Sequence, residues 1–276
     1  MLNLGFANRS RRIVGASVVV GCFATVAWAD FIDSAIVKTR IFNDDPDSIV
    51  SSTNLYPALI SIKDEKLDGN ESGGGFANRH NFHLSGNGGI SDYVFLNDTA
   101  FAFYADVQLT GTANSEGGLN VSPWWSQDVD GQFMINATSG EVAVFGGRLP
   151  FYSFTGNHGV TYAKGSTIRQ GVIYDPNSLT ELDPGTIEYI YTDDTGTYSS
   201  GKLNFDMGNP DEDPPYGLFG ILNDARVGGY FQPLIASGNP DNFGEVFFTK
   251  MEFIPEPATL GVLLLGGLVL IRRARD

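Results

Sequence analysis

The chain has 276 residues, of which 32 are acidic and 17 are basic, so its net charge is −15 at pH 7. A surface this acidic repels nucleic acid and anionic lipid headgroups, which excludes nucleic acid as a partner. Cys22 is the only cysteine, so no internal disulfide forms and the fold depends on its hydrophobic core alone.

The first 29 residues predict a secretory signal peptide. A basic start is followed by an apolar stretch over residues 13–24 and then by a small-x-small cleavage site, the order typical of such peptides. The basic residues are Arg9, Arg11 and Arg12, and the cleavage-site residues are Ala27 and Ala29. The mature chain then begins at Asp30. A lipoprotein signal ending at Cys22 is the alternative, but the residues after it stay apolar up to Ala29.

The mature region, residues 30–253, is predicted to be one acidic domain. Without the six terminal arginines, Glu256 and Asp276, the remaining charges give a net value of about −19. Neither a Pro/Ser-rich linker nor an internal repeat interrupts this region, and its length suits a single sandwich.

Strand follows strand in this region, and no stretch shows sustained 3.6-residue periodicity. Residues 101–110 place Phe101, Phe103, Ala105, Val107 and Leu109 on one face, which is typical of a half-buried antiparallel strand. Further predicted strands span residues 35–42, 58–63, 132–136, 141–145, 167–174, 186–192, 197–205, 216–222, 227–232 and 245–253. Residues 193–196 predict a hairpin turn. The pattern predicts an all-β antiparallel jelly-roll or β-sandwich.

Several of these strands resemble those of concanavalin A-like lectin and glucanase sandwiches. The resemblance rests on residues 132–136, 141–147, 186–205, 228–231 and 246–248. It implies the same sandwich fold over most of the mature domain. Glycan binding is one function that such a fold carries, although a fold alone does not fix the function.

Two features between residues 120 and 131 are candidate ligand contacts. Trp124 and Trp125 offer flat rings for stacking on sugars, although adjacent strand residues face opposite sides, so one ring is expected to pack against the core. Asp128 and Asp130 are candidate calcium ligands, although Ala137 stands where an EF-hand needs its last acid. The alternative to calcium is a solvated acidic loop.

Recognised catalytic signatures are missing from the sequence. Glucanase-type hydrolysis needs two acids on one strand, and the nearest match, residues 181–183, runs into a Pro-Gly turn. His80 and His83 lie three apart, which puts them on opposite faces of a strand. Together with His158 they are predicted to be ordinary surface or turn histidines. We therefore expect no catalytic residues and no enzyme activity.

The last 22 residues have three parts in a fixed order. Pro255-Glu256-Pro257 precedes an unbroken apolar run over residues 258–271, and three arginines follow: Arg272, Arg273 and Arg275. The run enters a bilayer, and the arginines hold its end on the cytoplasmic side. As a helix it spans about 21 Å, short of a hydrocarbon core of about 30 Å, so we expect a short transmembrane helix with snorkelling arginines.

This arrangement resembles the PEP-CTERM sorting signal of Gram-negative bacteria. The resemblance implies that an exosortase-type enzyme recognises the tripeptide, cuts near it and delivers the protein to the cell surface or matrix. The protein is then exported through the inner membrane and anchored there only transiently. The alternative is a plain C-terminal membrane anchor.

These observations predict an exported cell-surface or extracellular-matrix protein, a non-catalytic structural or adhesive component associated with exopolysaccharide. One alternative is a lectin-like, carbohydrate-binding module that uses a sandwich face or the Trp124–Trp125 pair. A polysaccharide hydrolase with an unrecognised acid pair is a further alternative. No cofactor is predicted apart from calcium.

Replacing both Pro255 and Glu256 by alanine tests the sorting signal. We expect the double variant to stay full-length in the inner membrane, because the processing enzyme no longer recognises the tripeptide. Mass spectrometry and cell fractionation measure this outcome. Release of the variant at the level of the unmodified chain would contradict the prediction.

Overall fold

The protein is built almost wholly from antiparallel strands. The computed structural model describes residues 32–69, 76–205, 219–221, 224–236 and 238–255. The predicted signal peptide with Ala27 and Ala29, the membrane run and its arginines, Glu256, Pro257 and most of the strand predicted at 216–222 lie outside the described residues. Within the described part, no helix is long and apolar enough to cross a membrane.

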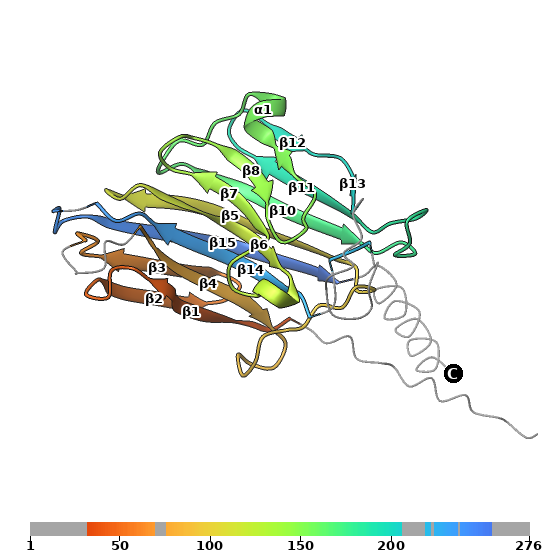
Figure 1. The fold of residues 1–276 in the computed structure, drawn as a ribbon, viewed down its shortest axis with the longest axis horizontal. Coiled ribbons are helices and arrows are strands. Elements are labelled where there is room, and N and C mark those ends of the chain that lie inside the picture. The colour runs from red at the N-terminus through yellow and green to blue at the C-terminus, as the bar shows by residue number, and fades with distance from the viewer. Residues whose placement is uncertain (1–31, 70–75, 206–218, 222–223, 237, 256–276) are drawn as a thin grey trace, which may run out of the picture.

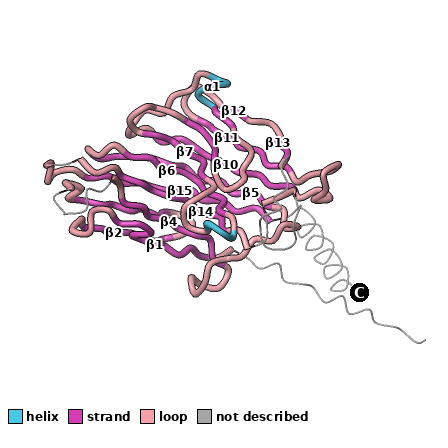
Figure 2. The backbone as a smooth tube through the Cα atoms, viewed as in Figure 1, coloured by secondary structure: helices cyan, strands magenta, loops and turns pink. Residues whose placement is uncertain are grey.

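The strands form two sheets (Figures 1 and 2). Sheet A has the order β1 (Ser34–Asn43), β4 (Asn78–Ser85), β14 (Arg226–Pro233), β6 (Ser115–Ser122), β7 (Gln132–Asn136), β8 (Val142–Phe145) and β9 (Tyr152–Ser153). Sheet B has the order β12 (Thr197–Ser199), β11 (Thr186–Thr192), β10 (Thr167–Asp175), β5 (Phe101–Gly111), β15 (Phe243–Pro255), β3 (Leu59–Glu65) and β2 (Ile49–Leu55), and β13 (Leu203–Asn204) also pairs with β11.

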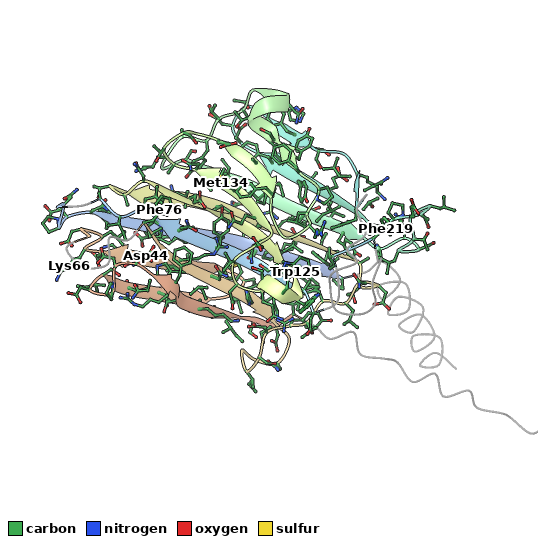
Figure 3. The ribbon with its side chains drawn as sticks, in the orientation of Figure 1. Asp44, Lys66, Phe76, Trp125, Met134 and Phe219 are labelled. Atoms are coloured by element: carbon green, nitrogen blue, oxygen red, sulfur yellow. The ribbon has the colours of Figure 1, made fainter. Side chains whose placement is uncertain are left out.

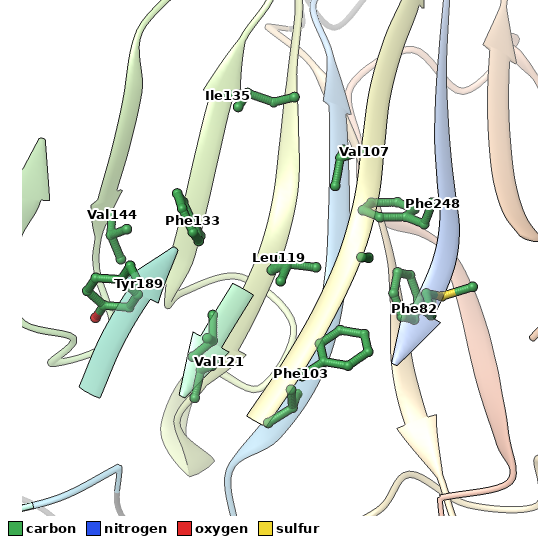
Figure 4. Packing of buried hydrophobic residues seen from close by; sticks show 14 of the residues in the cluster. Phe82, Phe103, Val107, Leu119, Val121, Phe133, Ile135, Val144, Tyr189 and Phe248 are labelled. Carbon is green, nitrogen blue, oxygen red and sulfur yellow. The ribbon is translucent and has the colours of Figure 1, made fainter. Parts of the chain in front are cut away.

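The hydrophobic core lies between the two sheets. The five residues predicted to share one face of β5 are all buried there, which confirms the period-2 interpretation of that strand. From sheet A, Phe82 of β4 packs edge-on against Phe248 of β15, with ring centroids 4.9 Å apart, and near Phe103 of β5 (Figure 4). Aromatic rings from both sheets thus interlock across the sandwich.

The predicted antiparallel sandwich is confirmed, and most predicted strands appear within two residues of their expected bounds. Four described strands, β2, β4, β6 and the two-residue β9, are missing from the prediction. The strand expected over 197–205 is broken in two, because Gly201 adopts a left-handed φ of 65° between β12 and β13. The residues between the strands also form a short helix, α1 (Phe154–His158), and a 3₁₀ turn, η1 (Trp124–Ser126).

Removing the ring of Phe248 should test the interlocked core. We expect Phe248→Ala to lower the free energy of unfolding by about 3–5 kcal/mol, because the ring is fully buried and leaves a cavity. Urea denaturation measures the change. Leu182→Ala is the control, since that side chain is 97% exposed and its loss should cost less than about 0.5 kcal/mol.

Candidate functional site

The outer face of sheet A carries a group of polar side chains that points away from the core. Because Phe82 and Leu84 of β4 point into the core, the alternate positions of that strand point outward. We call the group the polar face. Its members are Lys38 of β1, Arg79, Asn81 and His83 of β4, Asn120 of β6 and Tyr230 of β14.

The register of three adjacent strands fixes how these residues lie next to one another. Gly228 of β14 is paired with His83 on one side and with Asn120 on the other. Two residues further along β14, Tyr230 is paired with Asn81. A side chain at Gly228 would collide with the backbone oxygen of Phe82. The surface between His83 and Asn120, which we call the floor, is therefore formed by the backbone of β14 without a side chain.

Residues 123–131, which we call the strap, cross the polar face. Figure 3 shows Trp125 of the strap in front of sheet A. The backbone oxygen of Asp128 accepts hydrogen bonds from Arg79 Nε at 3.1 Å and from Asn81 Nδ2 at 2.5 Å. Gln132 Nε2 also donates to the backbone oxygen of Val129 at 2.9 Å. The strap therefore covers the floor and is held by its own carbonyl groups.

His83 is oriented by a half-buried carboxylate at one end of the polar face. Its Nδ1 lies 3.0 Å from Asp92 Oδ2 and donates a hydrogen bond to it, which leaves Nε2 facing the strap, 3.7 Å from Asp128 Oδ1. Lys38 Nζ bridges both acids, at 2.6 Å from Asp92 and 3.2 Å from Asp128. Burial raises the pKa of Asp92, but the hydrogen bonds from His83 and Lys38 outweigh it and hold that pKa well below its usual range.

Arg79 and Tyr230 form the other half of the polar face. The guanidinium carbon lies 4.3 Å from the centre of the tyrosine ring, a cation–π contact, and Nη1 donates to Gln232 Oε1 at 3.3 Å. Both side chains are fully buried. Burial lowers the pKa of Arg79 and raises the pKa of Tyr230 well above its usual range, so the phenol stays protonated at neutral pH.

Five polar atoms of this face are buried without a hydrogen-bond partner among the described residues. They are Arg79 Nη2, Asn81 Oδ1, His83 Nε2, Asn120 Oδ1 and Tyr230 Oη. An unpaired buried polar atom costs about 1–3 kcal/mol, and native proteins hold few of them. Their concentration on one face identifies it as the candidate functional site. It offers a cation, an oriented imidazole and a neutral phenol on two neighbouring strands.

The histidines predicted from the sequence lie in three different settings. His80 and His83 do point to opposite faces of β4, as predicted, but neither is a surface residue, because both are fully buried. His80 points inward, with Nε2 3.0 Å from Asp64 Oδ2 of β3. His158 is exposed at the end of α1, as predicted, with Nε2 2.9 Å from the hydroxyl of Tyr152.

The candidate ligand contacts of the sequence all lie on the strap. Trp125 is 37% exposed, whereas Trp124 is only partly exposed, in line with the expectation of one outward ring. The carboxylate of Asp128 faces Lys38, and that of Asp130 lies against Gly146. Among the described residues, no three His, Cys, Asp or Glu side chains come together as metal ligands. The calcium prediction for Asp128 and Asp130 thus stays untested.

Sequence reasoning assigned a catalytic role to no member of the polar face. The signal available to it was the dense run Asn78-Arg79-His80-Asn81, which carries more hydrogen-bonding groups than a half-buried strand normally does. No sequence feature indicates a functional role for Tyr230, because an aromatic residue in a strand is most often part of the core.

Comparisons with known proteins give structural matches only. No protein-family model and no curated protein matches the chain. Among solved structures, the alginate lyase from Corynebacterium sp. matches with a TM-score of 0.45 and 9% identity, covering 81% of this chain and 94% of that one. The PL7 alginate lyase AlyA1 from Zobellia galactanivorans matches with a TM-score of 0.40 and 11% identity, covering 76% and 81%. The alginate lyase from Klebsiella pneumoniae matches at 0.40 and 8%, covering 72% and 82%.

These matches contradict the functional prediction made from the sequence. That prediction was a non-catalytic structural or adhesive component, with a lectin-like module or a hydrolase as alternatives, and no enzyme activity. It is wrong, because the matched structures are polysaccharide lyases. With TM-scores below 0.5 and identities near 10%, the activity of this chain has to be argued from its own residues.

Two carboxylates with opposite pKa shifts allow the electrostatics to be tested. The pKa of Asp92 is lowered from 3.8, so its stabilising effect is present above that pH and is lost as the pH falls through and below 3.8. We expect Asp92→Asn to lower the free energy of unfolding at pH 7 by about 1.5–3 kcal/mol, and to flatten its decline toward pH 3.

Asp45→Asn is the matched control. Burial raises the pKa of Asp45, and one of its carboxylate oxygens is buried without a partner. Its charge therefore destabilises the fold above pH 3.8, and the amide should raise the free energy of unfolding at pH 7. Urea denaturation between pH 3 and 8 measures both variants. Equal effects of the two substitutions would contradict the assignment.

Proposed function

We propose that the polar face binds an acidic polysaccharide and cleaves it by β-elimination. The observation that supports this is the presence of a cation, an oriented base and a neutral acid on the outer face of β4 and β14, each with an atom free to bond. The three groups are Arg79, His83 and Tyr230. Elimination needs these three kinds of group and adds no water, so it requires no pair of catalytic carboxylates.

Arg79 supplies the charge that makes the elimination possible. The hydrogen next to the carboxylate of a uronic acid is hard to remove, because the anion left behind carries a second negative charge. A guanidinium that pairs with the carboxylate offsets this charge, and a buried one does so more strongly than one in water. Arg79 Nη2 is free for that role, whereas Arg79 Nε and Asn81 Nδ2 already donate to the backbone oxygen of Asp128.

His83 is the proposed base. Asp92 accepts the hydrogen on Nδ1, so the lone pair of a neutral His83 lies on Nε2, which has no hydrogen-bond partner among the described residues. The ionised Asp92 also stabilises the imidazolium that forms when Nε2 takes the proton. Of the three proposed reacting groups Asp92 contacts only the base, so it is a positioning residue.

Tyr230 is the proposed acid. Its hydroxyl is unpaired, and its raised pKa keeps the proton in place at neutral pH. The electron pair of the broken C–H bond forms a C=C bond, the bond to the glycosidic oxygen breaks, and that oxygen receives the tyrosine proton. The products are a shortened chain and a chain whose new end carries a C=C bond conjugated with the carboxylate.

The substrate has to displace the strap before its carboxylate can reach Arg79. The backbone oxygen of Asp128 occupies two donors, on Arg79 and Asn81, that a substrate carboxylate would use. A pocket of about 380 Å³, lined by residues between Gly86 and Thr99, brings solvent to Asp92, at the edge of the polar face beside His83. A polysaccharide therefore enters along this edge and replaces the strap carbonyl with its own carboxylate.

The sorting proposal concerns the location of the same protein. We propose that the chain is exported and handed to an exosortase-type enzyme, on the strength of its two terminal segments. Pro255 is the last residue of β15 and pairs with Phe101 of β5. The last described strand thus includes the first residue of the tripeptide, which would leave the cleavage signal next to the folded domain.

The test is elimination assayed by the ultraviolet absorbance of the conjugated product. Alginate is the first substrate to try, since it is what the structurally similar enzymes are named for, and other polyuronates and a neutral glucan complete the panel. We expect new absorbance with a polyuronate and none with the neutral glucan. Tyr230→Phe and His83→Asn should each lower kcat by about 10²–10⁴-fold.

Tyr189→Phe is the matched control for Tyr230→Phe. Tyr189 is also fully buried, and its hydroxyl also lacks a hydrogen-bond partner, but it faces the core from β11. Its removal should leave the rate unchanged. If no polyuronate gives the chromophore, or if reducing ends appear without it, the proposed elimination is wrong.

A further inference from the structure

The free edge of sheet B has the features of a pairing surface. β2 (Ile49–Leu55) is the last strand of that sheet and pairs with β3 alone among the described strands (Figure 1). An edge strand exposes a row of backbone donors and acceptors that another strand can bind. Proteins usually block such edges with short strands, bulges, charges or proline.

The other sheet edges in the described part of the chain are blocked in these ways. β1, the edge of sheet A beside β2, carries Lys38 and is interrupted by an irregularity between Lys38 and Phe42, where Arg40 has a φ of 60°. The opposite edges are β9, with two residues, and β12, with three. β2 differs from all of them, because its seven residues pair with β3 in unbroken register.

The side chains of β2 also lack any of the usual protection. Its sequence, Ile-Val-Ser-Ser-Thr-Asn-Leu, holds no charge and no proline, in a chain with a net charge of −15. Every residue except Val50 is exposed, and the two large apolar residues at its ends, Ile49 and Leu55, are 47% and 62% exposed. A strand of this kind readily pairs with a strand of another chain.

We infer that β2 pairs in antiparallel fashion with β2 of a second copy of this chain. A two-fold axis at Ser52 places Ile49 of each copy opposite Leu55 of the other, which buries both apolar pairs. Ser51 then faces Thr53, Val50 faces Asn54, and no charges of like sign oppose each other within the strand. The sequence of β2 is thus complementary to itself, which is the requirement of a symmetric interface.

The acidity of the chain sets how this dimer responds to salt. Two copies with a net charge of −15 repel each other over long distances, while the paired strands themselves are neutral. Salt shortens the Debye length from about 30 Å at 0.01 M to about 10 Å at 0.1 M and so removes most of that repulsion. The dimer is therefore favoured by added salt, the opposite of an interface built on ion pairs.

Cysteine cross-linking locates the interface. Residues at the two-fold axis lie opposite their own copy, with Cβ atoms about 4.5–5.5 Å apart, so Ser52→Cys should form a disulfide-linked dimer under mild oxidation. Ser199→Cys is the matched control, because Ser199 is an exposed serine on β12, the opposite edge strand of the same sheet. We expect at least about tenfold more cross-linked dimer for Ser52→Cys.

Sedimentation equilibrium of the purified full chain measures the association itself. The dimer fraction should rise with protein concentration and between 0.01 and 0.5 M NaCl. Ser52→Lys places two like charges at the axis and should give a monomer that keeps the circular-dichroism spectrum of the unmodified chain, whereas Ser199→Lys should leave the dimer intact. A chain that stays monomeric under all conditions, or a Ser52→Lys variant that still dimerises, would overturn the inference.

Discussion

The chemistry of the polar face depends on one packing constraint, the burial of Phe82 between the two sheets. Its ring lies against Phe248, and successive side chains of a strand point to opposite sides, so fixing Phe82 inward fixes Arg79, Asn81 and His83 outward. A shift of one residue in the register of β4 would turn all of them over. The hydrophobic core therefore selects the face on which the cation and the base appear, although it contacts neither.

The strap pairs some polar atoms of the polar face and leaves others unpaired, and this affects both the stability of the free protein and the binding of a ligand. It hydrogen-bonds the Nε of Arg79 and the amide of Asn81, but Arg79 Nη2 and the hydroxyl of Tyr230 beneath it remain unpaired. Each unpaired atom weakens the closed arrangement by about 1–3 kcal/mol. A ligand that bonds these atoms regains that free energy, and this offsets part of the cost of displacing the strap. The groups that destabilise the free protein are thus the ones that favour the complex.

The sequence predicted the sandwich but not its site, and β4 shows why. Strands such as β5 alternate cleanly between apolar and polar residues, because one side meets the core and the other meets water. β4 has polar residues on both sides. His80 points inward and is stabilised by Asp64 of the opposite sheet, a partner 16 residues away whose position only the fold reveals. The strap likewise buries the outward side of β4, whereas the alternation of the sequence alone predicts that this side is exposed to solvent. The odd spacing of His80 and His83 did predict correctly that the two side chains point to opposite faces of the strand.

Because the chain is acidic, any attraction for an acidic polysaccharide has to come from contacts at short range. An acidic polymer is repelled by a protein with a net charge of −15, but this repulsion acts between exposed charges and is screened within about 8 Å at physiological ionic strength. Lys38 and Arg79 belong to the polar face, and Arg226 of β14 lies near its edge. Lys38 and Arg226 both lie beside Asp92. Arg79 alone is fully buried and has no acidic partner within ion-pair distance among the described residues. Its field is therefore the least screened, and in the proposed reaction it would favour a carboxylate-bearing sugar over a neutral one.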